Sequence, residues 1–105
     1  MKIRLEPHKT TLRLSKVEFT KLLNDGNLSE KTDLPGGSTI EVHLFLKEQQ
    51  SFKYKNNLFH FELPNQVIRS YKPSKTGLSF YFQLDTKNQH EFLFEVDIKK
   101  KPLNN

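Results

Sequence analysis

The sequence predicts an α+β domain that is mostly β, with a mainly antiparallel sheet of six to eight strands, one capped α-helix and one short helix. Apolar and polar residues alternate along several segments, as in strands with one buried face. One other segment repeats apolar residues at helical spacing. Turn-forming Gly, Pro, Asn and Asp residues separate these segments. The alternation fits an open sheet and a barrel-like closed sheet equally well.

The first two strands are predicted to form a hairpin. Residues 2–6 and 10–14 both alternate, and Pro7-His8-Lys9 provides the turn between them. Their inward residues are expected to be Ile3, Leu5, Leu12 and Leu14.

A helix of about ten residues follows, which is marginal alone and must pack on the sheet. Ser15 and Glu18 fit a capping box at its start. Gly26 suits the left-handed position that ends a helix. The apolar stripe consists of Phe19, Leu22 and Leu23.

The middle of the chain predicts an edge strand, a strong strand and a second hairpin. The polar segment 28–34 suits an edge, and Pro35-Gly36-Gly37 a turn. The strong strand has four apolar residues on one face: Ile40, Val42, Leu44 and Leu46. This alternation places Phe45 on the opposite face of the strand. Asn56-Asn57 fits a two-residue turn that pairs Phe52 with Phe61 and Tyr54 with Phe59.

Residues 63–71 predict a short helix or irregular crossing, started by Pro64 and stopped by Pro73. Two further alternating strands follow, with Leu78, Phe80, Phe82 and Leu84 inward in one and Phe92, Phe94, Val96 and Ile98 in the other. We expect one contiguous core that includes Phe19, Leu22, Ile40, Val42, Leu44, Phe80, Phe82, Phe92 and Phe94. Residues 1–98 are interpreted as a single domain and residues 99–105 as a frayed basic tail.

Composition limits the classes of function. The chain has 105 residues and no Cys, which excludes disulfides, thiolate chemistry and Cys-type zinc sites. Its start lacks the apolar region of a signal peptide, and no apolar run approaches the length of a membrane span. We therefore expect a cytoplasmic protein without a membrane partner. The net charge of +5 permits nucleic-acid binding without implying it.

The N-terminal part of the chain carries a set of distinctive motifs: Met1-Lys2-Ile3-Arg4, Leu12-Arg13-Leu14-Ser15, Glu18 and Gly26. They match an opening M-[KR]-I-R and a later R-L-[ST]-x-x-E near the first helix. In these motifs the chain resembles a family of short bacterial proteins with no assigned activity. The resemblance implies similar domain limits and gives no function.

No residue pattern predicts catalysis, a cofactor or a metal. The histidines His8, His43, His60 and His90 lack metal-site spacing and are expected to be solvated. Glu95 and Asp97 share a strand face, which is ordinary for an amphipathic strand. Ser15 stands at a helix start, where an N-cap role is favoured over an anion site. The chain is therefore not expected to be an enzyme.

Two functional hypotheses remain. The leading one is a small non-enzymatic binding domain that associates with itself or with a protein partner. Its expected surface lies on the outward strand faces and comprises Phe45, His43, Leu58 and Leu93. The alternative is a nucleic-acid-binding module that uses a basic N-terminal face. The expected contacts are Lys2, Arg4, Lys9, Arg13, Lys16 and Lys21.

Overall fold

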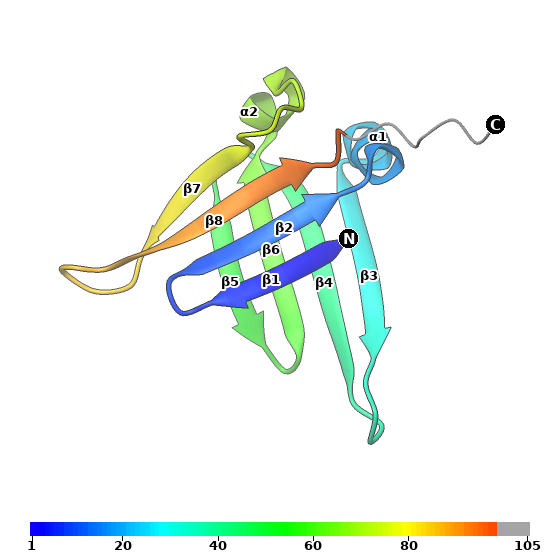
Figure 1. Cartoon of the computed structure of the whole chain (residues 1–105), viewed down its shortest axis with the longest axis vertical. Helices are drawn as coiled ribbons and strands as arrows, with labels where there is room; N and C mark the ends of the chain where they lie inside the picture. The colour runs from blue at the N-terminus through cyan, green and yellow to red at the C-terminus, as the bar shows by residue number, and fades with distance from the viewer. Residues whose placement is uncertain (99–105) are drawn as a thin grey trace. The chain divides into compact units, whose positions relative to one another are not determined.

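The computed structural model describes residues 1–98, so the basic tail predicted for 99–105 lies outside the described residues. The described chain contains eight strands and two helices, which confirms an α+β fold that is mostly β (Figure 1). It divides into two compact units. Of the described residues, the terminal unit contains 1–16 and 72–98, and the inserted unit contains 17–71. Each unit has its own four-stranded sheet in place of the single larger sheet expected.

The terminal sheet joins two antiparallel hairpins; the first was predicted as a hairpin, and the second pairs two strands that alternation predicted. They are β1 (Lys2–Glu6) with β2 (Lys9–Leu14), and β7 (Leu78–Gln83) with β8 (Gln89–Val96). The inner strands β2 and β8 pair in parallel, which gives the order β1-β2-β8-β7 (Figure 1). Local sequence did not predict the parallel pairing, because its two strands are separated by the whole inserted unit.

The inward face of the terminal sheet is buried at its centre and open at its edges. Its buried residues are Thr10, Leu12, Leu14, Phe80, Phe92, Phe94 and Val96. Leu5 is 59% exposed because β1 is an edge strand, and Ile3 is half-buried. Leu84 is 52% exposed because β7 ends at Gln83, and Phe82 is half-buried. Leu5 therefore lies on the inward face, opposite Thr10, as expected, but is not buried there. Leu84 lies beyond the end of the strand to which it was assigned.

The inserted unit begins within the first turn of the predicted helix, α1 (Lys16–Asp25). Phe19 and Leu22 are buried, while Leu23 is half-buried. Gly26 adopts φ +77°, and its amide donates to the Leu22 carbonyl at 2.8 Å, as expected of a helix end. The helix contacts the second one, α2 (Asn65–Ser70), through a bond of 2.8 Å from Arg69 Nη1 to the Leu23 carbonyl.

The inserted sheet repeats the plan of the terminal sheet. It pairs β3 (Asn27–Asp33) with β4 (Thr39–Lys47), and β5 (Ser51–Lys55) with β6 (Leu58–Pro64). Strands β4 and β6 are parallel, and the order is β3-β4-β6-β5. The register pairs Phe52 with Phe61 and Tyr54 with Phe59, as predicted. Asn56 and Asn57 have the positive φ that the predicted turn requires.

Burial confirms seven of the nine expected core residues; Ile40 and Phe82 are half-buried instead. The inward face of the inserted sheet has Val42, Leu44, Phe59, Phe61 and Leu63 buried. Because the nine residues belong to both units, a contiguous core stays a prediction, as does the single domain over 1–98.

Candidate interaction surfaces

The outward face of the inserted sheet gathers aromatic and histidine side chains at its centre. The parallel register sets His43 beside His60 and Phe45 beside Glu62, and Leu58 lies beside Glu41. Alternating residues of a strand share one face, so these side chains lie opposite the buried residues. We call the half-buried group His43, Phe45, Leu58, His60 and Glu62 the His–Phe face.

Phe45 is the centre of the His–Phe face. Its ring stacks on His60 with centroids 5.0 Å apart, and it meets His43 edge-on at 6.3 Å. Lys47 Nζ lies 5.7 Å from the centroid of the same ring, within the range of a cation–π contact. Phe45 therefore points outward, as the pleat predicts, and packs among polar side chains that leave part of it accessible.

The histidines are less solvated than expected. His60 Nε2 lies 2.8 Å from Glu62 Oε2, and both side chains are about one-third exposed. His90 Nε2 lies 2.7 Å from the hydroxyl of Thr10, which is fully buried. The prediction of solvated side chains was therefore wrong for these two and for half-buried His43, because aromatic, carboxylate or hydroxyl neighbours pack against them. No three His, Asp or Glu residues of the described chain are placed to hold a metal ion.

The structure brings together three of the four residues expected at an interaction surface. His43, Phe45 and Leu58 share the His–Phe face. Leu93 belongs to β8 of the terminal sheet, where the register sets it between Thr11 and Ser79. The sequence did not single out His60 and Glu62 for this surface, although the predicted outward position of His60 was a usable signal.

Four of the six residues expected to contact nucleic acid share one face of the terminal sheet. The outward face of the terminal sheet carries Lys2, Arg4, Lys9 and Arg13, while Lys16 and Lys21 belong to α1. Acidic residues interleave with these cations. Arg13 Nη2 lies 3.3 Å from Asp97 Oδ1, and Arg4 Nε lies 4.0 Å from Glu6 Oε2. The face is thus mixed in charge.

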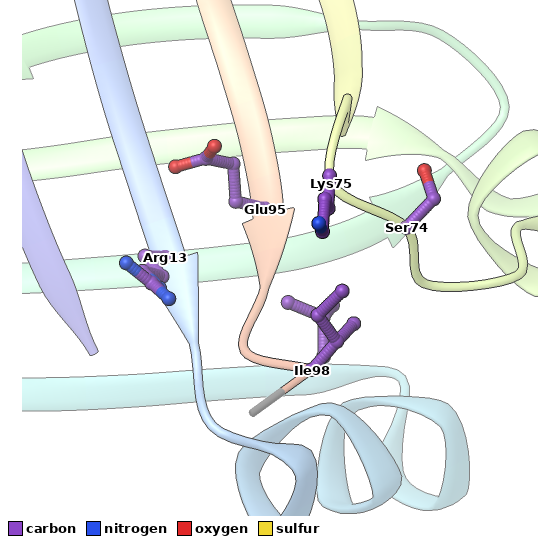
Figure 2. A pocket seen from close by; sticks show the side chains of 6 residues that line it. Arg13, Ser74, Lys75, Glu95 and Ile98 are labelled. Atoms are coloured by element: carbon purple, nitrogen blue, oxygen red, sulfur yellow. The ribbon is translucent and has the colours of Figure 1, made fainter. Parts of the chain in front are cut away.

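A depression of about 480 Å³ lies on the terminal unit. Figure 2 shows Arg13 of β2 and Glu95 of β8 on one side, with Ser74 and Lys75 from the segment before β7 on the other. Val96 and Ile98 complete the described lining. The charged groups of these walls, Arg13, Lys75 and Glu95, are suited to ion pairing. Sequence patterns gave no signal for Ser74 and Lys75, because they lie outside regular structure.

Asp85 has a lowered pKa in the turn between β7 and β8. The side-chain amide of Asn88 and the backbone amides of Lys87 and Asn88 donate to its carboxylate and favour the charged form. The group is fully exposed and its bonds stay within the turn, so its role is to hold the hairpin.

Comparisons with known proteins give the family of the chain. No helix of the described residues is long and apolar enough to cross a membrane. No curated protein and no solved structure matches the chain. A family model described as a family of unknown function, DUF7009, matches residues 1–101. Since this match spans nearly the whole sequence and both units, the chain belongs to DUF7009, a family of unknown function.

Proposed function

We propose that this chain is a small non-enzymatic binding domain of the bacterial cytoplasm, which binds a protein partner through the His–Phe face. One observation carries the proposal: Phe45 is half-buried at the centre of an outward sheet face, stacked on His60 and in edge contact with His43. A few residues near the centre of a patch supply most of the binding energy of protein interfaces, and aromatic residues are enriched in the buried centres of such patches. The contacts with the two imidazoles also restrict the Phe45 ring before any partner arrives.

The charges around Phe45 indicate the chemistry of the partner. The register places four lysines around the His–Phe face: Lys31, Lys47, Lys53 and Lys55. Glu41 lies 3.6 Å from Lys31 Nζ, and Glu62 lies against His60. The Lys31–Glu41 pair is neutral, and Lys47, Lys53 and Lys55 leave the rim positively charged, so it favours a protein segment that carries acidic residues around an apolar side chain.

The non-enzymatic part of the proposal rests on side-chain chemistry. The sequence has no Cys and no motif that pairs a nucleophile with a base, and no cofactor is implied by its motifs. The nucleic-acid alternative rests on four cations of the terminal sheet, two of which lie beside carboxylates. Acidic neighbours weaken attraction for phosphate, so we favour the protein partner.

The test uses the full chain labelled with ¹⁵N and a synthetic peptide of Asp and Glu residues around a single Leu. We expect peptide-induced shifts in the NMR spectrum to cluster at His43, Phe45 and His60. Phe45→Lys should abolish them, while Val17→Lys, which adds the same charge at a residue 79% exposed on α1, should leave them unchanged.

Three outcomes would contradict the proposal. Peptide shifts could be absent or lie elsewhere. Phe45→Lys could cost several kcal/mol of unfolding free energy in the monomer, which would make Phe45 a core residue. Single-stranded RNA or DNA could shift Lys2, Arg4 and Arg13 with a strong dependence on salt, while the peptide has no effect, which would favour the nucleic-acid alternative.

A further inference from the structure

One edge strand differs from the other three in charge. Within residues 1–98, the two sheets end in four edge strands, β1, β3, β5 and β7. Charged side chains on an edge strand discourage pairing with another chain. Three edges carry them: Lys2, Arg4 and Glu6 on β1; Glu30, Lys31 and Asp33 on β3; Lys53 and Lys55 on β5. Strand β7, with the sequence LSFYFQ, carries none.

The residues of β7 are also those that favour strand pairing. The segment 78–84, LSFYFQL, is free of charge, Pro and Gly and is rich in aromatic residues. Two of its large side chains remain accessible, since Tyr81 is 53% and Leu84 is 52% exposed. Among residues 1–98, the outer edge formed by β7 therefore lacks the charged side chains that protect the other three edges.

Hydrogen bonds of the sheet decide which backbone groups of β7 face outward. The amide of Glu91 donates to the carbonyl of His8, just before β2, and the amide of Asp97 donates to the carbonyl of Leu14, at the end of β2. Odd-numbered residues of β8 therefore bond toward β2. Even-numbered residues of β8 then bond toward β7, and the amide of Leu84 donates to the Asn88 carbonyl in the same pattern. The backbone groups of Ser79, Tyr81 and Gln83 consequently point away from β8.

The segment has a palindromic order centred on Tyr81. Read from either end it gives Leu, a polar residue, Phe, Tyr, Phe, a polar residue, Leu. An antiparallel second copy in register at Tyr81 would match Leu78 with Leu84, Ser79 with Gln83, and Phe80 with Phe82. The same register pairs odd-numbered residues with odd-numbered residues, which are those whose backbone groups face outward. Sequence order and backbone direction thus select one register.

We propose that β7 pairs with β7 of a second copy of this chain about a two-fold axis at Tyr81, joining two terminal sheets into one of eight strands. A two-fold interface must be self-complementary, and a palindromic strand without charge meets this condition. Exposed Leu84 would then pack beside Leu78 of the second copy. A single strand pair buries less surface than a standard stable interface, so the dimer forms at elevated concentration. This inference is independent of the His–Phe face, which belongs to the inserted unit.

The first test is the association of the full chain by sedimentation velocity, from about 1 μM to about 1 mM. We expect a reversible monomer–dimer equilibrium. The variant Ser79→Lys with Gln83→Lys places like charges opposite each other twice and should weaken the dimer about tenfold or more. The variant Ser79→Lys with Gln83→Glu alters the same positions but places opposite charges across the axis, and should restore the dimer.

The matched control adds two lysines to a different edge, with Asn27→Lys and Ser29→Lys on β3, and should leave association unchanged. Circular dichroism of each variant checks that it folds. A wild-type chain that is monomeric throughout would overturn the proposal, as would a dimer that resists the paired lysines at positions 79 and 83. A dimer abolished by Phe45→Lys alone would assign association to the His–Phe face instead.

The second test fixes the register. The natural sequence has no Cys, so Tyr81→Cys introduces a unique thiol at the proposed axis. A short bismaleimide should crosslink this variant into dimers, because directly opposed residues of antiparallel strands lie about 5.5 Å apart at Cα. Ser29→Cys, on β3, is the control and should remain monomeric. Equal crosslinking of the two variants would contradict self-pairing at β7.

Discussion

The two sheets of this chain share one topological plan and differ in how the chain reaches it. In each, two antiparallel hairpins meet through a parallel pair of inner strands. The hairpins of the inserted sheet follow one another directly, with only residues 48–50 between β4 and β5. Those of the terminal sheet are separated by the entire inserted unit. Inner strands therefore pair in parallel both when one strand separates them in the chain, as for β4 and β6, and when the whole inserted unit does, as for β2 and β8. In both pairs, the two strands bury the same face.

The inward faces also differ in chemistry. The buried residues of the inserted sheet are entirely apolar. The terminal sheet includes fully buried Thr10, whose hydroxyl lies 2.7 Å from His90 Nε2. A buried hydroxyl is tolerated when it has a hydrogen-bond partner, so the terminal sheet depends on one specific polar contact that the inserted sheet does not need.

The largest expected effects test whether the two sheets contribute equally to stability. Phe61 of the inserted sheet and Phe94 of the terminal sheet are both fully buried. Phe61→Ala and Phe94→Ala should each lower the free energy of unfolding by about 3–5 kcal/mol, measured by urea denaturation. Phe82→Ala should cost less, because Phe82 is half-buried. A loss below about 1 kcal/mol at only one of the two buried Phe residues would show that the two sheets contribute unequally to the free energy of unfolding.

Glycines of the two units differ in the space around them. Gly77 precedes β7 with φ +67°, and a Cβ there would lie 2.7 Å from the carbonyl oxygen of Phe94. Gly36 has φ +91° but nothing within 4 Å of its Cβ position. Gly36→Ala should cost about 1–2 kcal/mol from backbone strain alone. Gly77→Ala should cost clearly more, and equal losses in thermal denaturation would show that β7 can shift to admit the methyl group.

The buried polar contact can be tested by exchanging residue types between the sheets. Thr10→Val removes the hydroxyl and leaves His90 without that partner atom, which should cost about 1–3 kcal/mol. Val42→Thr places a hydroxyl on the apolar inward face of the inserted sheet and should cost a similar amount. Denaturant titrations of both variants provide the measurement. If Thr10→Val leaves the free energy of unfolding unchanged, the Thr10–His90 contact adds no stability.

The smallest expected effect concerns the β7–β8 turn and its pH dependence. The lowered pKa of Asp85 means that its carboxylate stabilises the folded state above the ordinary value of 3.8. This contribution is lost as the pH falls through the lowered pKa. Asp85→Asn should therefore reduce the melting temperature slightly at neutral pH, and the gap should close under acidic conditions below 3.8. A gap that is independent of pH would show that the charge of Asp85 does not hold the turn.

Local patterns in the sequence determined most of the elements. Alternation located the strands, and the two-residue turn at Asn56-Asn57, whose positive φ asparagine tolerates, fixed the register of β5 and β6. Gly26 marked the end of α1. The outward position of Phe45 also followed from pleat geometry alone, because its neighbours Leu44 and Leu46 were assigned to the other face. Each of these features depends on residues that are close together in the sequence, where the residue types themselves restrict the backbone conformation.

Tertiary structure decided what depends on residues far apart in the sequence. It split eight strands into two sheets, paired β2 with β8 and β4 with β6 in parallel, and set His60 against Phe45. It also placed β7 at the edge of a sheet, where its palindromic sequence can pair with a second copy; the sequence alone does not show that this strand is an edge. Strand pairing is specified by which faces can be buried together. That choice is a property of the whole folded chain, since any two strands with one apolar face satisfy the local rules equally well.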